Sequence, residues 1–408
     1  MARLFEGKKV GVVGLGVNNR RLAEFLSSQD VKFEVIENWK DANELVGRLD
    51  GFDLIFRTPG LPYLSVAIQQ AKGCGAEISS QTKLFFELCK AKIIGVTGTK
   101  GKGTTSSLIT KILEAGGYKV WLGGNIGRDP FEFLEQISPS DIVVLELSSF
   151  QLQDLAQSPH IAVVLAITPD HLNHHKDFEE YIRAKSQILA HQTNEDFAIL
   201  HPDLPDWFKK LGKGKKIFFD SNQFADVPRK LLGLHNLQNI VAASEVAKLL
   251  NVNADIIRKT VAEFEALPHR LKVLKHINGI TYVDDTFSTS IESTLAALDA
   301  IVGNLVLIVG GSDKGLDFTR LGEHIKNSKK IQGIVVIGDV TELIVKSLQG
   351  FNGRILTGAK NISEILAQAQ NMSSSGDTIL FSPATASFGI FKNEMDRGEQ
   401  FVGFVNKL

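Results

Sequence analysis

Short apolar runs that end in glycine-rich or polar turns, and that alternate with helical patterns, recur along the chain. Such runs are typical of strands that are buried in a parallel sheet. The predicted strands fall within residues 9–16, 31–37, 52–60, 76–88, 93–96, 118–127, 141–147, 161–175, 280–298, 305–318, 333–339, 354–358 and 377–391. Helices are expected between them, for example from about residue 20 to 28. This alternation predicts an α/β protein.

The strands and helices fall into three blocks, and the sequence between the blocks indicates where domains end. A chain of 408 residues has room for two or three domains of ordinary size. The first block ends near residue 90, and Pro268 has the features of a linker. We therefore predict domains at residues 1–90, 91–267 and 268–408.

Composition and charge exclude several classes of protein. Apolar residues make up 43% of the chain and the net charge is −1, so nothing indicates binding to nucleic acid or to a membrane surface. The two cysteines are too few for a disulfide framework and lack metal-ligand spacing. The first residues read as the approach to a strand, so we expect no signal peptide, and no apolar run is long enough to span a bilayer. We expect a cytoplasmic protein.

The stretch GVTGTKGKGTTSS, residues 95–107, has the order of parts of a phosphate-binding loop. An apolar strand leads into it, three glycines surround Lys102, and a helical pattern starts at Leu108. Glycines let backbone N–H groups turn toward a phosphate, and a helix N-terminus adds partial positive charge. The strict pattern has a hydroxyl after the lysine, where this chain has Gly103, so Thr104 is the nearest hydroxyl for Mg²⁺. The alternative is a glycine-rich turn with a solvated lysine.

Acidic and histidine side chains follow the neighbouring predicted strands. Glu146 and the pair Asp170 and His171 lie at carboxyl ends of strands, where active sites of such sheets gather. A carboxylate at this place suits Mg²⁺. His174 and His175 could join His171 in a metal site, but solvated loop histidines are common, and only His171 is a candidate.

The turn after the first predicted strand resembles the opening of a Rossmann unit. Gly14 and Gly16 match the first two glycines of the dinucleotide fingerprint, whereas Asn19 stands at the third. Glu37 lies where an acidic residue could meet a ribose. A nucleotide site and a turn that merely requires glycine geometry are both compatible with this pattern.

Two helical segments carry polar residues whose role the pattern leaves open. Lys185 lies beside the apolar face of residues 178–189, where a lysine usually extends along the helix to solvent. Asn236 and Asn239 lie three residues apart on one face of the next helix, where they could bracket a nucleotide or cap the helix.

Taken in order, these motifs resemble those of the Mur ligases of peptidoglycan synthesis. They read GVTGTKGKGTT, GGNIG, LELSSFQL, an Asp-His pair, YIRAK, GLHNLQN, LPHR, DD before STLAAL, GGSDK, and SPATASF followed by FKN and RG. The resemblance covers nearly the whole chain. It implies a Rossmann-like N-terminal domain for UDP, a central P-loop ATPase-type domain with a parallel sheet, and a Rossmann-like C-terminal domain for an amino acid.

The resemblance also implies a reaction, and the chain is most similar to the family member that adds D-glutamate. ATP phosphorylates the carboxylate of UDP-N-acetylmuramoyl-L-alanine, and the amine of glutamate then displaces phosphate through a tetrahedral intermediate. A carboxylate becomes a good electrophile only when one oxygen is a phosphate leaving group, and the developing charge requires Mg²⁺ and fixed cations. These small molecules, and not nucleic acid or a membrane, are the implied partners of a monomeric enzyme.

The resemblance assigns site residues by position. Lys102, His171 and Lys185 are the implied catalytic residues, and Lys185 is at the position that the family carbamylates, which would make it an anion for a second Mg²⁺ beside His171. Thr104 and Glu146 are the implied ligands of the first Mg²⁺. The implied ATP-side residues are Gly98, Thr99, Lys100, Gly101, Lys102, Gly103, Thr104, Thr105, Asn236, Asn239, His269, Arg270 and Asp285.

Two further groups of residues are implied for the other substrates. The UDP-sugar positions are Leu15, Val17, Glu37, Asn38 and Thr58 for uridine, with Asn125, Ser148 and Gln151 for the muramoyl part. The amino-acid positions are Thr289, Lys314 and Ser387.

Two departures from the family pattern concern the amino-acid pocket. Phe287 stands where a lysine is usual, and Glu394 stands where a phenylalanine is usual. Losing a cation and gaining a carboxylate should weaken a site for a dicarboxylate. The cations that could compensate are Lys392, Arg397 and Lys314.

Several alternatives are weighed on the sequence alone. A folylpolyglutamate synthase shares Gly-Lys-Gly followed by a hydroxyl, but the full N-terminal UDP-type domain before the phosphate loop argues against it. A variant ligase could use L-glutamate, another amino acid or another acceptor, and a non-catalytic relative could only bind nucleotide. A nicotinamide dehydrogenase would rest on the turn at residues 14–19 alone, and a P-loop switch would hydrolyse nucleotide without any amino acid.

Overall fold

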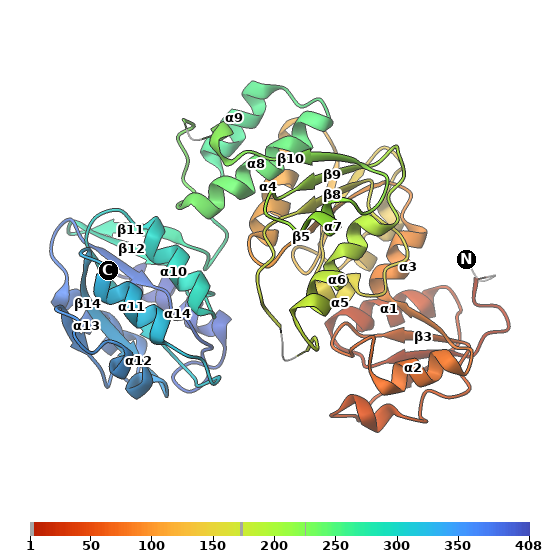
Figure 1. Cartoon of the computed structure of the whole chain (residues 1–408), viewed down its shortest axis with the longest axis horizontal. Helices are drawn as coiled ribbons and strands as arrows, with labels where there is room; N and C mark the ends of the chain where they lie inside the picture. Colours follow the sequence, from red (N-terminus) through yellow and green to blue (C-terminus); the bar gives the residue numbers. More distant parts are fainter. Residues whose placement is uncertain (1–3, 172–173, 225) are drawn as a thin grey trace. The chain divides into compact units, whose positions relative to one another are not determined.

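The computed structural model describes residues 4–171, 174–224 and 226–408, which form three β-sheets flanked by helices (Figure 1). The N-terminal sheet has four parallel strands in the order β2-β1-β3-β4. Because the four strands are parallel, the turns after β1 and β3 lie at the same carboxyl end of the sheet, and the strand order reverses between these two strands. The elements are β1 (Val10–Val13), α1 (Val17–Ser28), β2 (Phe33–Ile36), η2 (Ala42–Leu45), β3 (Leu54–Arg57), α2 (Val66–Gly73), β4 (Glu77–Ser80) and α3 (Gln81–Leu88).

The central sheet has six parallel strands in the order β10-β9-β8-β5-β7-β6. Strand β5 lies between β7 and β8, so the three loops after these strands meet at one edge. The elements are β5 (Lys92–Thr97), α4 (Lys102–Ala115), β6 (Val120–Gly124), η3 (Pro130–Glu132), η4 (Leu134–Gln136), β7 (Ile142–Glu146), α5 (Ser149–Leu152), β8 (Ile161–Val164), α6 (Phe178–Ala190), β9 (Phe197–Leu200), α7 (Asp206–Lys209), β10 (Lys215–Phe218), η5 (Ser221–Phe224), α8 (Leu234–Leu249) and α9 (Ala254–Glu263).

The C-terminal sheet has six strands in the order β11-β12-β16-β13-β14-β15. Strand β11 pairs antiparallel with β12, and the other pairs are parallel. The elements are β11 (Lys272–Ile277), β12 (Ile280–Asp284), α10 (Ile291–Ala300), β13 (Leu305–Gly310), α11 (Thr319–Asn327), β14 (Ile331–Ile337), α12 (Thr341–Ser347), β15 (Arg354–Leu356), α13 (Ile362–Met372), β16 (Thr378–Phe381) and α14 (Glu394–Val405).

The central strands of these sheets are buried on both faces, as the apolar runs predict. Every residue of β13 is buried, and so are the residues of β7 before Glu146. The chain forms two compact units: residues 1–227 with 238–261, and residues 228–237 with 262–408. One of the three divisions between these units, between residues 237 and 238, falls inside α8, whereas the predicted domain boundaries lie at residues 90 and 267; these boundaries stay predictions. No helix in the described part of the chain is long and apolar enough to cross a membrane.

Strands β9, β10 and β11 are absent from the prediction, which assigned no structure to the first two and a linker to the third. Strands β9 and β10 have four residues each, and β10 and β11 begin with lysines that mask an apolar pattern. The predicted α/β class with three sheets of mainly parallel strands is confirmed.

Candidate active site

The loop between β5 and α4 has the backbone geometry of an anion-binding turn. Gly98 has φ 149° and Gly101 has φ 86°. An added Cβ would lie 2.7 Å from Leu165 Cβ at Gly98 and 2.2 Å from Asn239 Oδ1 at Gly101. Gly101, with its left-handed backbone, is the N-cap of α4 and has no side chain with which to cap the helix. The first backbone N–H groups of a helix point along its axis, and together with the helix dipole they form the kind of N-terminus that suits a phosphate.

Helix α4 begins at Lys102, six residues before the helical pattern that the sequence indicated at Leu108. The prediction was wrong because small polar residues in the first two turns look like a loop. Thr105 and Ser106 are fully buried in these turns, and neither hydroxyl has a hydrogen-bond partner among the described residues. Thr104 is half-buried.

Lys102 folds back over the phosphate loop. Its Nζ donates to the carbonyl oxygens of Gly98 at 3.2 Å and Thr99 at 3.0 Å. Thr99 Oγ1 donates to the carbonyl of Thr168, in the loop after β8, at 3.0 Å. Glu146, half-buried at the end of β7, lies on the neighbouring strand. Thr97 Oγ1, at the end of β5, donates to the Leu147 carbonyl after β7 at 2.9 Å, so the loops after β5, β7 and β8 come together at the carboxyl ends of the central strands.

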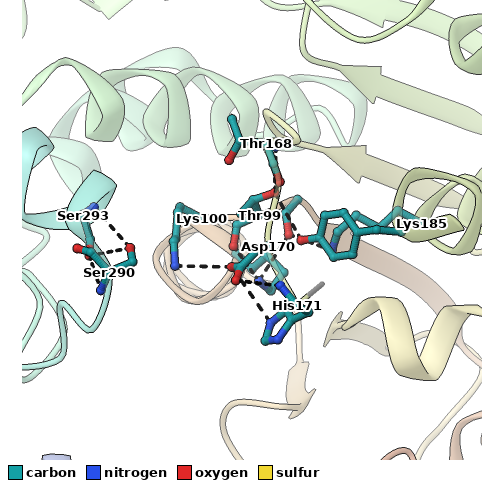
Figure 2. A network of polar contacts seen from close by, with 11 residues as sticks. Thr99, Lys100, Thr168, Asp170, His171, Lys185, Ser290 and Ser293 are labelled. Atoms are coloured by element: carbon teal, nitrogen blue, oxygen red, sulfur yellow. Dashed lines mark hydrogen bonds and ion pairs between the residues drawn. The ribbon is translucent and has the colours of Figure 1, made fainter. Parts of the chain in front are cut away.

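Lys185 is the residue that most contradicts its helical pattern. Its side chain does not extend to solvent: it is 1% exposed, and its Nζ donates to the Gly98 carbonyl at 2.9 Å (Figure 2). Burial and, secondarily, the charge of Lys102 hold the pKa of Lys185 well below its usual value, against the opposing effect of Asp170 and Glu146. A buried amine of this kind loses its proton readily and becomes a nucleophile.

Asp170 and His171 follow β8 and lie beside Lys100 (Figure 2). Lys100 Nζ is 3.5 Å from Asp170 Oδ2, and Asp170 Oδ1 accepts from the backbone N–H of His171 at 2.9 Å. His171 has φ 54° and a half-exposed side chain. Burial lowers the pKa of His171, which favours the neutral ring that a metal ligand requires.

The other two histidines of this segment are not a solvated loop. His175 is 1% exposed and bonds Ser149 Oγ through Nε2 at 2.9 Å and Glu180 Oε1 through Nδ1 at 3.2 Å. Burial, followed by the charge of His175, lowers the pKa of His174 to about 4. Among the described residues no three His, Cys, Asp or Glu side chains are grouped as a metal site. A Mg²⁺ ion bound here would need hydroxyl or substrate oxygens beside Glu146.

The predicted uridine positions surround the turns after β1 and β3. An added Cβ on Gly14 would lie 3.7 Å from Thr58 Cγ2 and 3.9 Å from Trp39, so these three residues are neighbours. Leu15 is half-buried in the same turn, while the side chain of Val17 lies outside the described residues. Trp39 was missed by the sequence analysis, which considered no aromatic residue for a uracil ring.

The remaining predicted UDP-sugar residues differ in exposure. Glu37 and Asn38 are exposed, and the guanidinium of Arg48 donates to both backbone carbonyls. Asn125 follows β6, and its backbone N–H donates to the Glu146 carbonyl at 3.1 Å. Ser148 and Gln151 form the reciprocal cap that starts helix α5.

The predicted nucleotide residues of the C-terminal unit form a buried network. His269 and Leu271 have left-handed backbones, with φ 62° and 48°. His269 Nδ1 is 2.7 Å from Asp284 Oδ2, and Leu271 N–H donates to Asp285 Oδ1 at 3.0 Å. Arg270 is thus presented between two anchored residues. Burial raises the pKa of Asp285 to about 7, although Ser288 and Ser382 hydroxyls oppose this shift.

Asn236 and Asn239 lie in the first turns of α8, and both are buried. Asn236 Nδ2 donates to the Leu232 carbonyl at 2.8 Å, which ties the first turn of α8 to the preceding loop; its roles in nucleotide binding or capping stay predictions. Asn239 Oδ1 lies where a side chain on Gly101 would be, so it borders the phosphate loop.

The predicted amino-acid residues differ in burial. Lys314 is exposed, Thr289 is half-buried, and Ser387 is 1% exposed with no partner for its hydroxyl among the described residues. Arg397 is buried and donates to the carbonyls of Thr286 and Thr385.

Burial lowers the pKa of Arg397 to about 10, and its guanidinium joins the two loops that carry Thr289 and Ser387. It is therefore a structural cation. Phe287 lies 4.9 Å from the His269 ring and 5.6 Å from the Arg270 guanidinium, so a cation lies over the ring that replaces the usual lysine.

Comparisons with known proteins identify the family. Residues 96–227 match the Mur ligase middle domain, and residues 269–385 match the Mur ligase glutamate ligase domain. A protein of Clostridium kluyveri, named UDP-N-acetylmuramoylalanine–D-glutamate ligase, is 35% identical over 98% of this chain and 97% of its own. This chain belongs to the Mur ligase family. A second Mur ligase of the same name, from Acetivibrio thermocellus, is 33% identical over 99% of this chain and 97% of its own.

Solved Mur ligase structures share the fold. The MurF ligase of Thermotoga maritima, in complex with ADP, has a TM-score of 0.62 and 20% identity, covering 98% of this chain and 95% of its own. The UDP-N-acetylmuramate-alanine ligase MurC of Thermotoga maritima has a TM-score of 0.59 and 16% identity, covering 98% of this chain and 99% of its own. At these identities the likeness concerns the fold alone, and it agrees with the predicted multi-domain α/β architecture.

Proposed function

We propose that this chain is the ATP-dependent ligase that joins D-glutamate to UDP-N-acetylmuramoyl-L-alanine in peptidoglycan precursor synthesis. The full-length relatives that bear this name support the substrates. The observation that carries the chemistry is the buried Lys185 at the Gly98 carbonyl, beside Lys102 in a phosphate-binding loop. A P-loop switch or a dehydrogenase has no use for this arrangement.

In the proposed reaction, the alanyl carboxylate attacks the γ-phosphorus of ATP, and ADP leaves. The backbone N–H groups at the start of α4 hold the phosphate oxygens, and Lys102 compensates the charge that develops on them. The glutamate amine then attacks the acyl carbon, loses a proton, and the tetrahedral intermediate expels inorganic phosphate. The products are the amide, ADP and phosphate.

The donor set of the loops fits Mg²⁺, which as a Lewis acid would neutralise charge on the phosphates. We propose that Thr104 and Glu146 hold one ion with the nucleotide phosphates. The second site would use His171 and Lys185, because a neutral buried amine can add CO₂ and become a carbamate anion. The depressed pKa of Lys185 supports this modification, since a protonated lysine cannot attack CO₂.

The other roles follow from position. Trp39, Thr58 and the Gly14 turn would form the uridine side, and Thr289, Lys314 and Ser387 would bind the glutamate. Arg270 and Asp285 would serve the nucleotide. A monomer and a cytoplasmic location stay predictions.

The test is phosphate release with ATP, Mg²⁺ and UDP-N-acetylmuramoyl-L-alanine, comparing D-glutamate, L-glutamate and no amino acid. We expect release that depends on D-glutamate. A preference for L-glutamate would move the specificity to Phe287 and Glu394 while keeping the mechanism. Absence of release with either amino acid would contradict the proposal.

A further inference from the structure

Arg57, at the end of β3, is a buried cation for which the proposed mechanism has no use. It is 1% exposed, and its guanidinium binds three partners: the carbonyl of Leu61 at 3.1 Å, the carbonyl of Phe150 at 2.6 Å, and the carboxylate of Asp154. Asp154 is 3% exposed. Buried charges are tolerated when their hydrogen bonds are satisfied, and a guanidinium fork can satisfy several acceptors at once. Arg57 therefore links two segments that are 93 residues apart in sequence.

One of these segments is the turn that follows β3. Leu61 N–H donates to the Thr58 carbonyl at 3.0 Å, which closes the turn, and the Arg57 guanidinium donates to the Leu61 carbonyl. Thr58 faces Gly14, next to Trp39, at the proposed uridine side. The position of the Leu61 carbonyl is thus tied to that of Thr58, which would contact the uridine part.

The other segment is helix α5, whose four residues are too few to hold a helix without outside contacts. Its cap consists of Ser148 and Gln151, the predicted contacts of the muramoyl part. Arg57 holds the helix through the Phe150 carbonyl, and His175, in the loop before α6, holds it through Ser149 Oγ.

The side chain of Phe150 extends this arrangement toward the reaction centre. Its ring lies 4.1 Å from the His174 ring and 5.1 Å from the His171 ring, between ring centroids. A shift of α5 would therefore move both the cap residues and the packing of His171.

We infer that Arg57 is a positioning residue that couples the uridine-side turn to helix α5, so that seating of the UDP part sets α5 for the muramoyl-alanine part. This inference rests on the proposed function. Arg57 touches no reacting atom; it acts through the carbonyls of Leu61 and Phe150. Without the guanidinium, two buried carbonyls and the Asp154 carboxylate lose their donor, and the two segments are no longer joined.

The first test is the steady-state kinetics of Arg57→Ala. We expect the KM for UDP-N-acetylmuramoyl-L-alanine to rise about tenfold or more, with the KM for ATP within about twofold, because Arg57 holds the turn after β3 and helix α5 rather than the phosphate loop. A change in the packing of His171 should appear in kcat. Arg57→Lys keeps the positive charge beside Asp154 but not the planar guanidinium that reaches several acceptors. Its KM for UDP-N-acetylmuramoyl-L-alanine should therefore lie between those of the wild type and Arg57→Ala. The control is Arg183→Ala, which removes an exposed arginine paired with Glu179 on α6. A purely structural role would lower the amount of active enzyme and leave both KM values unchanged, which would overturn the inference.

The second test is hydrogen exchange of the backbone amides of residues 150–154, with and without UDP. In the wild-type protein UDP should slow this exchange; in Arg57→Lys, UDP should still bind but leave the exchange unchanged. If Arg57→Ala does not fold, Asp154→Asn carries the kinetic test, since it loosens the guanidinium while keeping a polar partner. If UDP binds to the wild-type protein without slowing amide exchange in α5, the inference about Arg57 is wrong while the proposed function stands. Absence of UDP binding to the wild type refutes the proposed function itself.

Discussion

The turn after β1 and the loop after β5 use the same backbone device for different ends. Each has a glycine with positive φ, Gly14 at 71° and Gly98 at 149°, and each leads into a helix whose glycine N-cap makes no side-chain hydrogen bond. The β5 loop is then surrounded by Lys102, Lys185 and the strand-end acids. The β1 turn meets Thr58 and Trp39 instead.

This difference indicates that the glycine backbone shapes a binding turn, here called a cradle, in both places. The residues on the neighbouring strands and loops then determine its chemistry. A cradle lined with cations and carboxylates can stabilise charge in a transition state. A cradle lined with an indole and a hydroxyl can hold a base and a sugar but cannot activate a phosphate. The following predictions test this division of roles.

The largest effect is expected at Lys185. Lys185→Ala should lower kcat by about 100- to 1000-fold, because it removes a charge-stabilising group from the reaction centre. Short carboxylic acids added to the assay should restore part of the activity by replacing the carbamate. The control is Lys111→Ala, an exposed lysine of α4. Unchanged activity of Lys185→Ala would refute its role at the metal.

The pKa of Lys185 adds a pH dependence to the same comparison. Because burial lowers this pKa, the amine is neutral at a pH where an ordinary lysine is charged. Acidification through the lowered pKa protonates the amine, so carbamate is lost on the acid side and regained as the pH rises. Wild-type activity in CO₂-free buffer should recover with bicarbonate above this pKa and not below it. Activity independent of bicarbonate at every pH would argue against a carbamate.

Glu146→Gln should raise the Mg²⁺ concentration for half-maximal activity by about 10- to 100-fold. The amide keeps the size of the side chain but removes the charge that suits Mg²⁺. A Mg²⁺ titration measures the effect, with Glu114→Gln, an exposed residue of α4, as the control. A normal titration curve would remove Glu146 from the metal site.

Trp39→Ala should weaken UDP binding by about 1–3 kcal/mol if the indole stacks on the uracil. The wild-type protein should show UDP-dependent quenching of tryptophan fluorescence that Trp39→Phe abolishes. Trp207→Phe, which alters a half-exposed residue of α7, should keep the quenching. Equal UDP affinity in Trp39→Ala would leave the β1 turn without an aromatic contact.

The smallest expected effects are on stability, and they compare glycine-to-alanine substitutions in the β1 turn and in the β5 loop. Gly14→Ala should cost about 1–2 kcal/mol of unfolding free energy, the penalty of a left-handed backbone, since its Cβ meets only ordinary contacts. Gly101→Ala should cost more, because its Cβ would lie 2.2 Å from Asn239 Oδ1. Gly117→Ala, with φ 88° and open space, isolates the backbone penalty in a denaturant titration. Equal losses of unfolding free energy in the three variants would mean that a Cβ at Gly101 meets no steric clash in the β5 loop.

Much of the fold was predictable because the strands are apolar runs between glycine turns. The phosphate loop and the strand-end acids follow from the same pattern. The start of helix α4 could not be predicted, because the hydroxyl residues in its first turns have a composition typical of a loop. The burial of Lys185 depends on how α6 packs against β5, which no local pattern records.

Other parts of the site depend on long-range contacts. Trp39 becomes a candidate only when β2 and β3 flank β1, which brings residue 39 to the Gly14 turn. Arg57 and Asp154 are nearly a hundred residues apart, so their pairing is invisible in the sequence. The roles of the predicted residues as ligand contacts stay predictions until the experiments above are made.

The division of the chain inside helix α8 has a consequence for modular exchange. Residues 228–237 belong to the compact unit of the C-terminal sheet, whereas residues 238–261 belong to the other unit. The polypeptide thus crosses from one unit to the other three times, so neither unit is a single continuous segment. A recombination event at residue 268 would transplant the C-terminal sheet without its own first segment. Swapping the amino-acid specificity between such ligases should therefore succeed more often by changing individual loops than by splicing whole halves.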